Sequence, residues 1–441
     1  MISTQLKLAL RILRRRKFFT FISLFGISFT IMALVVVAAM GDAALGDNPP
    51  LSKRDRLVFA THFRSERVVP DTSYIVDSAI VGGATRYDTT LQIGEDTESD
   101  NNSALAVHLY ETYLENLESA VHQTFTAPAA TFDSYLSGRK VTLAGNFTDA
   151  EYWTVLDYRF LHGRPYSSEE LKAGARVVVL ADEAAEEYYG VADASLIGRE
   201  LKLGDTGYEI IGILARPVGA TAGFESDVFL PYTTAPANFL EVAYHGPGYA
   251  IFEAPTPAGR AAIVSELAGI ADRIQPLPDE DRNRFYLEGL TFFEEFAENF
   301  DGRGKERDRA LAAIGTPVLI LLVLLVLLPA LNLMNINVSR VYERAAEIAV
   351  RKSFGATDAD ILRQFVVETL VVTIIGGLLG AALAAGLVAL INGQRWLGDF
   401  TLRFTPEVIA YSLAIIVAFG LVTGLLPAWR MAQTRIATSL R

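Results

Sequence analysis

The residue types that most often carry chemistry are sparse in this sequence. The 441-residue chain has no cysteine, which excludes disulfides, thiolate metal sites and cysteine nucleophiles. The five histidines are His62, His108, His122, His162 and His245. They are too far apart along the chain for the close spacing with which two histidines of one helix or turn hold a metal ion. No metal site is therefore predicted.

Sequence motifs of the common catalytic classes are also absent. There is no G-x-x-x-x-G-K-[ST] phosphate loop, no H-E-x-x-H and no G-x-S-x-G. The acidic run Asp279–Asp281 is interpreted as a solvated loop rather than a cation site. A Ser/His/Asp group assembled only by folding stays open, but no feature favours one. We predict no catalytic, cofactor or metal site in this chain.

One charged segment, residues 340–368, has the pattern of a surface that contacts another protein. Arg340–Ser353 contains helix formers throughout, and Gly355 tolerates the left-handed conformation that ends a helix. Thr357 and Asp360 form a capping-box pattern that begins the next helix. The segment therefore predicts a helix, a tight turn and a second helix. On this pattern alone, a surface hairpin without any partner is an equal alternative.

Four uncharged runs are long enough to cross a membrane, which takes about 20 helical residues. They are residues 18–40, 310–339, 369–394 and 408–429. A hydrophobic content of 51% and a charged content of only 20% agree with membrane segments. Two alternatives are buried core helices for all four runs, and a cleaved signal peptide for the first run, although its apolar stretch is longer than that of a typical signal.

Basic residues beside these runs predict the orientation in the membrane. Residues 1–17 carry six Lys or Arg and no acid, and residues 430–441 carry three Arg and no acid. Both ends and the 340–368 connection are therefore expected in the cytoplasm, with 1–17 lying along the inner leaflet as an amphipathic segment. The short loop 395–407 and the long stretch 41–309 are expected on the periplasmic side.

The stretch 41–309 predicts a folded external domain of mixed α/β (α+β) structure with two lobes. It contains 23 basic and 44 acidic residues, so nearly all of the chain's acidity lies here. An acidic chain of this kind is not expected to bind nucleic acid. The expected elements are strands at Val177–Leu180 and Glu209–Leu214, helices at Leu105–Val121 and Ala258–Ile274, a hairpin turn at 204–207 and an exposed loop at Glu95–Ser103.

Small residues mark predicted packing faces within the membrane runs. Gly376 and Gly380 form a G-x-x-x-G pattern in the third run, and Gly420 and Gly424 form another in the fourth. Small residues at this spacing let membrane helices approach closely. No acid or base lies within the four runs, so an ion or proton path through them has no side chain to use.

The stretch from Asn332 to Thr369 resembles the signature of FtsX-type permeases. Its core is similar to E-I-G-x-R-K-A-x-G-A, with Ala349 and Ser353 at positions where the family usually has Gly and Ala. The external domain resembles that of macrolide-exporter (MacB-type) permeases, notably at Phe160–Tyr166. The matching residues of the signature are Glu347, Ile348, Arg351, Lys352, Gly355, Ala356, Ile361, Gln364, Phe365 and Glu368.

The resemblance implies an α-helical membrane protein with four transmembrane helices and the external domain inserted between the first two. It implies a dimer, with a second copy or a paralogue, that works with a separate ABC ATPase, where ATP and Mg²⁺ bind. It also implies a bacterial inner-membrane location with contacts to lipids and to a periplasmic or outer-membrane partner. The residues implied to contact the ATPase are Glu347, Ile348, Arg351, Lys352, Ser353, Phe354, Gly355 and Ala356.

The expected function is therefore that of a permease subunit, not an enzyme, that transmits ATP-driven motion to the external domain and drives export or extraction of a substrate. One alternative within the family is an FtsX-like regulator of a periplasmic enzyme. An alternative from another class is a membrane-anchored receptor or enzyme without an ATPase, although four spans exceed what an anchor needs.

Overall fold

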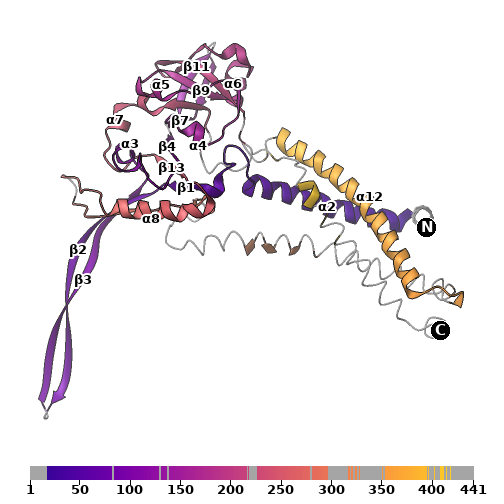
Figure 1. Cartoon of the computed structure of the whole chain (residues 1–441), viewed down its shortest axis with the longest axis horizontal. Coiled ribbons are helices and arrows are strands. Elements are labelled where there is room, and N and C mark those ends of the chain that lie inside the picture. The colour runs from indigo at the N-terminus through magenta and orange to yellow at the C-terminus, as the bar shows by residue number, and fades with distance from the viewer. Residues whose placement is uncertain are drawn as a thin grey trace. The chain divides into compact units, whose positions relative to one another are not determined.

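A computed structural model gives the structure of two compact units, each described here by itself (Figure 1). The described residues are 17–81, 84–128, 131–136, 139–215, 217, 226–278, 281–295 and 353–394, with 316–317, 319–320, 323–324, 327, 350, 396, 402, 408–411, 414 and 418. One unit contains helices α2 and α12. The other contains the β-sheets and lies within residues 49–310.

The helical unit is built on two long apolar helices, α2 (Lys17–Leu45) and α12 (Asp358–Gly393). Both are long and apolar enough to cross a membrane, over Leu24–Ala43 and Leu370–Gly393. They correspond to the first and third predicted runs. Most of the second and fourth runs, 310–339 and 408–429, lies outside the described residues.

A nine-stranded mixed sheet forms the centre of the other unit. The strand order is β1-β13-β4-β7-β12-β9-β11-β10, and β8 pairs with the end of β11. The pairs β9/β11 and β7/β12 are parallel and the others are antiparallel. The bounds are β1 (Leu57–Ala60), β4 (His122–Pro128), β7 (Gly145–Thr148), β8 (Phe160–Gly163), β9 (Val177–Ala181), β10 (Glu200–Leu203), β11 (Thr206–Leu214), β12 (Val228–Pro231) and β13 (Tyr249–Glu253).

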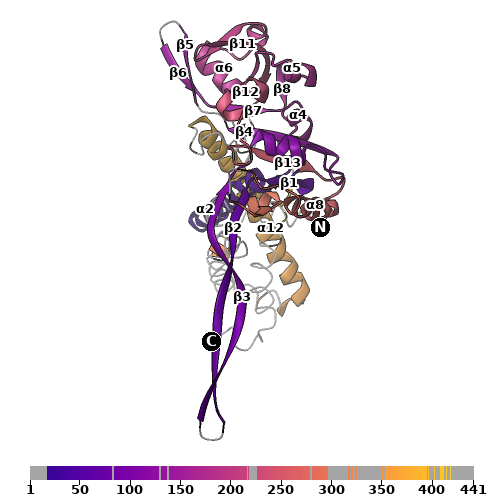
Figure 2. The same cartoon turned by 90° about the vertical axis from the view of Figure 1, so that its left-hand side faces the viewer.

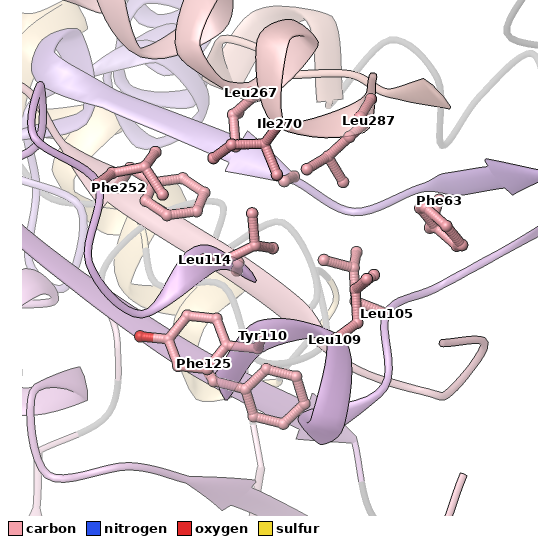
Figure 3. Close-up of a cluster of buried hydrophobic side chains, with 14 of the residues drawn as sticks. Phe63, Leu105, Leu109, Tyr110, Leu114, Phe125, Phe252, Leu267, Ile270 and Leu287 are labelled. Carbon is pink, nitrogen blue, oxygen red and sulfur yellow. The ribbon is translucent and has the colours of Figure 1, made fainter. Parts of the chain in front are cut away.

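Two hydrophobic clusters lie along this single sheet. The first packs α8 (Arg260–Ala271) and α3 (Val107–Leu109) on β1, β13 and β4, and Figure 3 shows Phe252, Leu267 and Ile270 within it. The second packs α6 (Asp182–Tyr189) on β9, β11 and β12. The shorter helical elements are η1 (Arg54–Arg56), η2 (Tyr110–Leu114), α4 (Tyr152–Val155), α5 (Ser168–Lys172), η3 (Ala194–Leu196), η4 (Tyr232–Thr234), α7 (Ala237–Leu240) and η5 (Pro257–Gly259).

A long hairpin, β2 (Phe63–Val81) and β3 (Ala84–Ser103), extends away from the nine-stranded sheet in both views (Figures 1 and 2). Its base pairs with β14 (Arg284–Leu287) in a three-stranded sheet, and β5 (Phe132–Leu136) pairs with β6 (Arg139–Leu143) separately. The prediction of a loop at Glu95–Ser103 was wrong, because this polar stretch is the second half of β3. Pairing with β2 and the ion pairs Arg284–Glu95 (2.7 Å) and Arg67–Glu98 (3.0 Å) hold it extended.

The predicted helix at Leu105–Val121 was also wrong beyond its first turns. The chain forms only α3 and the π-helical turn η2, which bury Leu109, Tyr110 and Leu114 as the pattern requires. After Leu114 the backbone leaves the helix because side chains bind its N–H groups. The Leu117 N–H donates to Gln123 Oε1 (3.1 Å) and the Ser119 N–H to Glu266 Oε2 (3.0 Å).

The other predicted elements of this unit are confirmed. Strands lie at Val177–Ala181 and Thr206–Leu214, and α8 lies inside the predicted helix Ala258–Ile274. The turn between β10 and β11 has Gly204 at a φ of 60°. The two-lobe division of residues 41–309 stays a prediction, since the described part has two clusters along one continuous sheet.

Asp149 is a buried carboxyl that lies three residues before the start of α4. It accepts hydrogen bonds from the Thr124 hydroxyl (2.5 Å), the Phe125 N–H (2.8 Å) and the Tyr152 N–H (2.9 Å). These three donors favour the ionised form, but burial outweighs them and raises the pKa of Asp149 to about 7. The folded protein therefore holds this proton at a pH where the unfolded chain has released it.

We predict that this unit loses stability as the pH rises from about 4 to about 7, by roughly 4 kcal/mol at the limit, because over this range the unfolded chain releases the Asp149 proton while the folded chain still holds it. Thermal unfolding of the detergent-solubilised chain at a series of pH values measures the slope. Asp149→Asn keeps a polar, uncharged group and should flatten it. An unchanged slope in this variant would assign the pH dependence to other groups.

Candidate coupling site

A tight turn connects the end of one helix to the start of α12. The Phe354 N–H donates to the Val350 carbonyl (3.2 Å), and the Ser353 hydroxyl donates to the same carbonyl (2.7 Å). Gly355 then has a φ of +94°. A Cβ at Gly355 would meet no atom within 4 Å, so this position favours glycine for its backbone conformation and not for space. The left-handed end predicted at Gly355 is confirmed.

Helix α12 begins with the predicted capping box. The Asp360 N–H donates to Thr357 Oγ1 (3.2 Å), and the Thr357 N–H donates to Asp360 Oδ2 (3.1 Å). The Thr357 hydroxyl also donates to Asp360 Oδ2 (2.6 Å), and these hydrogen bonds lower the pKa of Asp360. The carboxylate is thus kept ionised at the positive end of the helix dipole. These bonds fix the angle at which the chain turns into α12.

The turn presents one large apolar side chain to its surroundings. Phe354 is 89% exposed, while the small residues on either side of it shape the turn. An exposed aromatic group on a rigid turn is suited to filling an apolar groove of another protein. Of the residues predicted to contact an ATPase, Ser353, Phe354, Gly355 and Ala356 form this turn. Glu347, Ile348, Arg351 and Lys352 lie outside the described residues.

The two glycines predicted to pack in the third run lie against α2. A Cβ at Gly376 would come within 2.5 Å of Ile27 Cγ2, and one at Gly380 within 2.6 Å of the Ser28 carbonyl oxygen. The backbones of the two helices are therefore as close as glycine permits. Gly420 and Gly424 lie outside the described residues. The spacing of the two glycines does not identify α2 as the partner, although the buried residues of α2 recur every four positions: Ile27, Ile31, Val35 and Ala39.

One histidine lies at the base of the β2–β3 hairpin. His245 joins Ser65 (2.8 Å) and Ser103 (2.7 Å), one residue from each strand of the hairpin base. Ser65 is only 1% exposed, so its hydroxyl cannot reach a substrate and its contact with His245 is structural. Among the described residues, no group of three or more His, Cys, Asp or Glu side chains could hold a metal ion.

Two models of known protein families match this chain. A family model described as the MacB-like periplasmic core domain matches residues 20–270, which is more than half of the chain. A second model, the FtsX-like permease C-terminal domain, matches residues 319–436 and includes the Ser353–Ala356 turn. The chain belongs to the MacB/FtsX family of ABC transporter permeases. The resemblance drawn from the residue signature is thereby confirmed.

The relatives of this MacB/FtsX-type permease are distant. It is 24% identical to the macrolide export ATP-binding/permease protein MacB of Rhodopseudomonas palustris over 97% of the chain, and it spans 58% of that relative's length. It is also 24% identical to the uncharacterized ABC transporter permease YknZ of Bacillus subtilis, over 79% of the chain and 82% of the relative. The crystal structure of the periplasmic region of MacB from Actinobacillus actinomycetemcomitans matches with 13% identity and a TM-score of 0.33, over 45% of the chain and 84% of that structure.

Proposed function

We propose that this chain is a permease subunit that transmits ATP-driven motion across the inner membrane to its periplasmic domain. The observation that supports this most is the continuity of α12. One unbroken helix runs from the capping box at Thr357 to Gly393, so the exposed turn and the membrane segment belong to one rigid element. A movement imposed at Phe354 is therefore carried along α12.

The ATPase belongs to another chain in this proposal. The 441 residues contain no phosphate-loop motif, which supports placing ATP and Mg²⁺ on an ATPase partner in this proposal. The proposed arrangement has four transmembrane helices, both termini in the cytoplasm, the 340–368 hairpin on the ATPase and residues 41–309 in the periplasm. Two such permease chains, identical or paralogous, work as a dimer in the inner membrane.

Export or extraction of a substrate from the periplasmic side is the proposed outcome. Two relatives are named for export, MacB for macrolides and PvdT for pyoverdine. The match of a MacB-like periplasmic core domain to residues 20–270 supports this role. The alternative, control of a periplasmic enzyme as in FtsX-like regulators, uses the same transmission, so a test of coupling addresses both.

We expect Phe354→Glu to abolish productive association with the ATPase while the chain still inserts into the membrane. Loss of one central aromatic contact costs about 2 kcal/mol or more, roughly thirtyfold in affinity, and an introduced carboxylate adds desolvation. The measurement is the ATP hydrolysis activity that co-purifies with the tagged chain in mild detergent. The fraction of chain recovered in membranes checks insertion.

A matched control is available at the other end of the same helix. Trp396, just beyond Gly393, is also an exposed aromatic residue, at 64%. In the proposed topology it lies on the periplasmic side, so Trp396→Glu should leave the co-purified ATPase unchanged. Equal retention of the ATPase by the Phe354 and Trp396 variants would contradict the coupling site.

A further inference from the structure

Both connections from the sheet-containing unit to the predicted membrane runs leave from the same edge of the nine-stranded sheet. The first connection enters β1, the first strand in the sheet order, through η1. The second leaves beside β1, because the Phe59 N–H donates to the Leu290 carbonyl (2.8 Å) and the Leu290 N–H donates to the Phe59 carbonyl (2.7 Å). A buried hydrogen bond from the Thr61 hydroxyl to Glu295 Oε2 (2.6 Å) holds the segment that follows Leu290. The surface around η1 and Leu290 is therefore the part of this unit from which the chain leads to the bilayer on both sides.

The chain between α2 and η1 is short. Asn48 stays beside the last turn of α2, since its side-chain amide donates to the Asp42 carbonyl (3.0 Å). Arg54 follows six residues later, and each residue extends at most about 3.4 Å. Arg54 therefore lies within about 20 Å of Asn48. On the second connection, only residues 296–309 separate Glu295 from the run that begins at residue 310.

The surface at η1 combines basic and aromatic side chains. The guanidinium carbon of the partly exposed Arg54 lies 5.5 Å from the ring centroid of Phe292 and 5.4 Å from that of Phe293. Phe292 is only 2% exposed, whereas Phe293 is 43% exposed. The two rings therefore hold the guanidinium group beside an exposed apolar side chain. We call this set the basic–aromatic patch, which consists of Lys53, Arg54, Arg56, Phe292 and Phe293.

Lys53 and Arg56 share one buried carboxylate. Lys53 Nζ donates to Glu253 Oε2 (2.9 Å), and the Arg56 guanidinium donates to Glu253 Oε1. Glu253 is 3% exposed, whereas the side chains of Lys53 and Arg56 are 31% and 33% exposed. Residues 51–56 contain three basic residues and one acidic residue, although residues 41–309 contain 44 acidic and 23 basic residues. An excess of positive charge in an acidic domain thus lies at its connection to the membrane.

The two acids that follow Phe293 are bound within their own surroundings. Glu294 accepts a hydrogen bond from the Thr291 N–H (2.7 Å). Glu295 is 6% exposed and accepts the hydrogen bond from Thr61. An anion that approaches the patch therefore meets mainly its basic side chains.

We propose that the basic–aromatic patch binds the phosphate groups of phospholipids in the periplasmic leaflet of the membrane. A guanidinium group binds phosphate through two parallel hydrogen bonds, and stacking on two rings reduces the conformational freedom that it loses on binding. The exposed ring of Phe293 enters the headgroup region, where aromatic side chains are favoured. The partner is a bilayer rather than a protein, because both chain connections from this edge lead to membrane runs. The contact rests on the proposed membrane topology but does not depend on coupling to an ATPase.

The absence of cysteine allows a single fluorescent probe to be placed beside the patch. Asp55→Cys puts a thiol on η1 without removing any residue of the patch, and Asp205→Cys is the matched control. Both aspartates are exposed, and Asp205 lies in the turn between β10 and β11, at the opposite end of the sheet order from β1.

The full chain is labelled with a bimane maleimide and reconstituted into vesicles of phosphatidylethanolamine and phosphatidylglycerol. The vesicles include a phospholipid that carries a nitroxide on its headgroup, which quenches only fluorophores close to it. We expect the nitroxide to quench the probe at position 55 at least about twofold more than the probe at position 205, because the patch holds η1 at the headgroups.

Substitutions in the patch distinguish lipid binding from closeness caused by the chain connections alone. One basic residue at an anionic membrane surface contributes about fivefold in affinity, so Arg54→Glu should lower the quenching at position 55 to that at position 205. Arg54→Gln removes the charge without reversing it and should lower the quenching in the same direction, as should Phe293→Ser. The matched control is Arg176→Glu, which reverses the charge of an exposed arginine just before β9 and should leave the quenching unchanged.

Three outcomes overturn the proposal. One is equal quenching at positions 55 and 205, which shows that the patch is not at the headgroups. The second is quenching at position 55 that survives both Arg54 variants and Phe293→Ser, which shows that the chain connections alone bring η1 close to the membrane. The third is an equal loss of quenching in Arg176→Glu, which assigns the effect to overall charge. Flotation of the vesicles tests anchorage separately: a chain that does not float contradicts the proposed topology and this contact with it. The Phe354→Glu experiment tests coupling.

Discussion

Replacing Gly163 by alanine is expected to cause a large loss of stability in the sheet-containing unit. Gly163 ends β8 at a φ of +72°, where a residue with a Cβ is strained by about 1 kcal/mol. The added Cβ would also lie 2.1 Å from the Ile211 carbonyl oxygen and 2.9 Å from Gly212 Cα. Neither backbone atom can move without breaking the β8/β11 pairing. Together the two effects should cost about 3–4 kcal/mol.

The measurement is thermal unfolding of the full chain in detergent, where a loss of this size lowers the midpoint by about 10 °C. Gly190→Ala is the matched control. Gly190 has a similar φ of +79°, but a Cβ there meets no atom within 4 Å. Gly190→Ala should lose only the part of the stability that comes from the strained backbone conformation, about 1 kcal/mol. Equal losses for the two variants would show that the close approach of β8 to β11 contributes nothing.

The second large effect is expected at the contact between α2 and α12. In Gly380→Leu the Cβ would lie 2.6 Å from the Ser28 carbonyl oxygen and 2.7 Å from Ile31 Cβ. A leucine therefore forces the two helices apart along the surface that buries Ile27, Ile31 and Val35. Overpacking of this kind costs about 1–3 kcal/mol, and separated membrane helices regain no hydrophobic driving force, because lipid is as apolar as their side chains.

We expect Gly380→Leu to lower the unfolding midpoint in detergent and to reduce the ATPase activity that co-purifies with the chain. Gly386→Leu is the matched control, since Gly386 lies on the same helix and a Cβ there meets no atom within 4 Å. Like Gly380→Leu, this variant replaces a glycine of α12 by a leucine, but at a position where the added Cβ has open space around it. If the two variants behave alike, the close contact of α12 with α2 is not important for this protein.

The sequence predicted best those structural features that depend on residues close together in the chain. Gly355, Thr357 and Asp360 form the predicted turn and capping box because each interaction involves atoms within three residues. The buried strands Val177–Ala181 and Thr206–Leu214 follow from continuous apolar runs. Such signals do not depend on residues far away in the sequence. The turn and the capping box of the candidate coupling site are predicted in this way.

The errors arose where a distant residue decides the local structure. Glu95–Ser103 is too polar to read as a strand, yet β2 and Arg284 hold it extended. The predicted helix after Leu114 has a suitable apolar pattern, but Gln123 and Glu266 bind the backbone of this segment from outside. Likewise, the spacing of Gly376 and Gly380 predicts a packing face without showing that α2 is the helix that fills it.

Because α12 is one continuous helix, a small rotation at one end moves the other end by a large distance. Its 36 residues contain no proline, and at 1.5 Å per residue they form a rod of about 54 Å. A rotation of about 10° around the end at Asp358 sweeps the end at Gly393 along an arc of about 9 Å. A sub-ångström shift at the turn can thus become a displacement wider than a strand spacing. Displacements of that size, measured by spin labels at the two ends of α12, would report its angular motion directly.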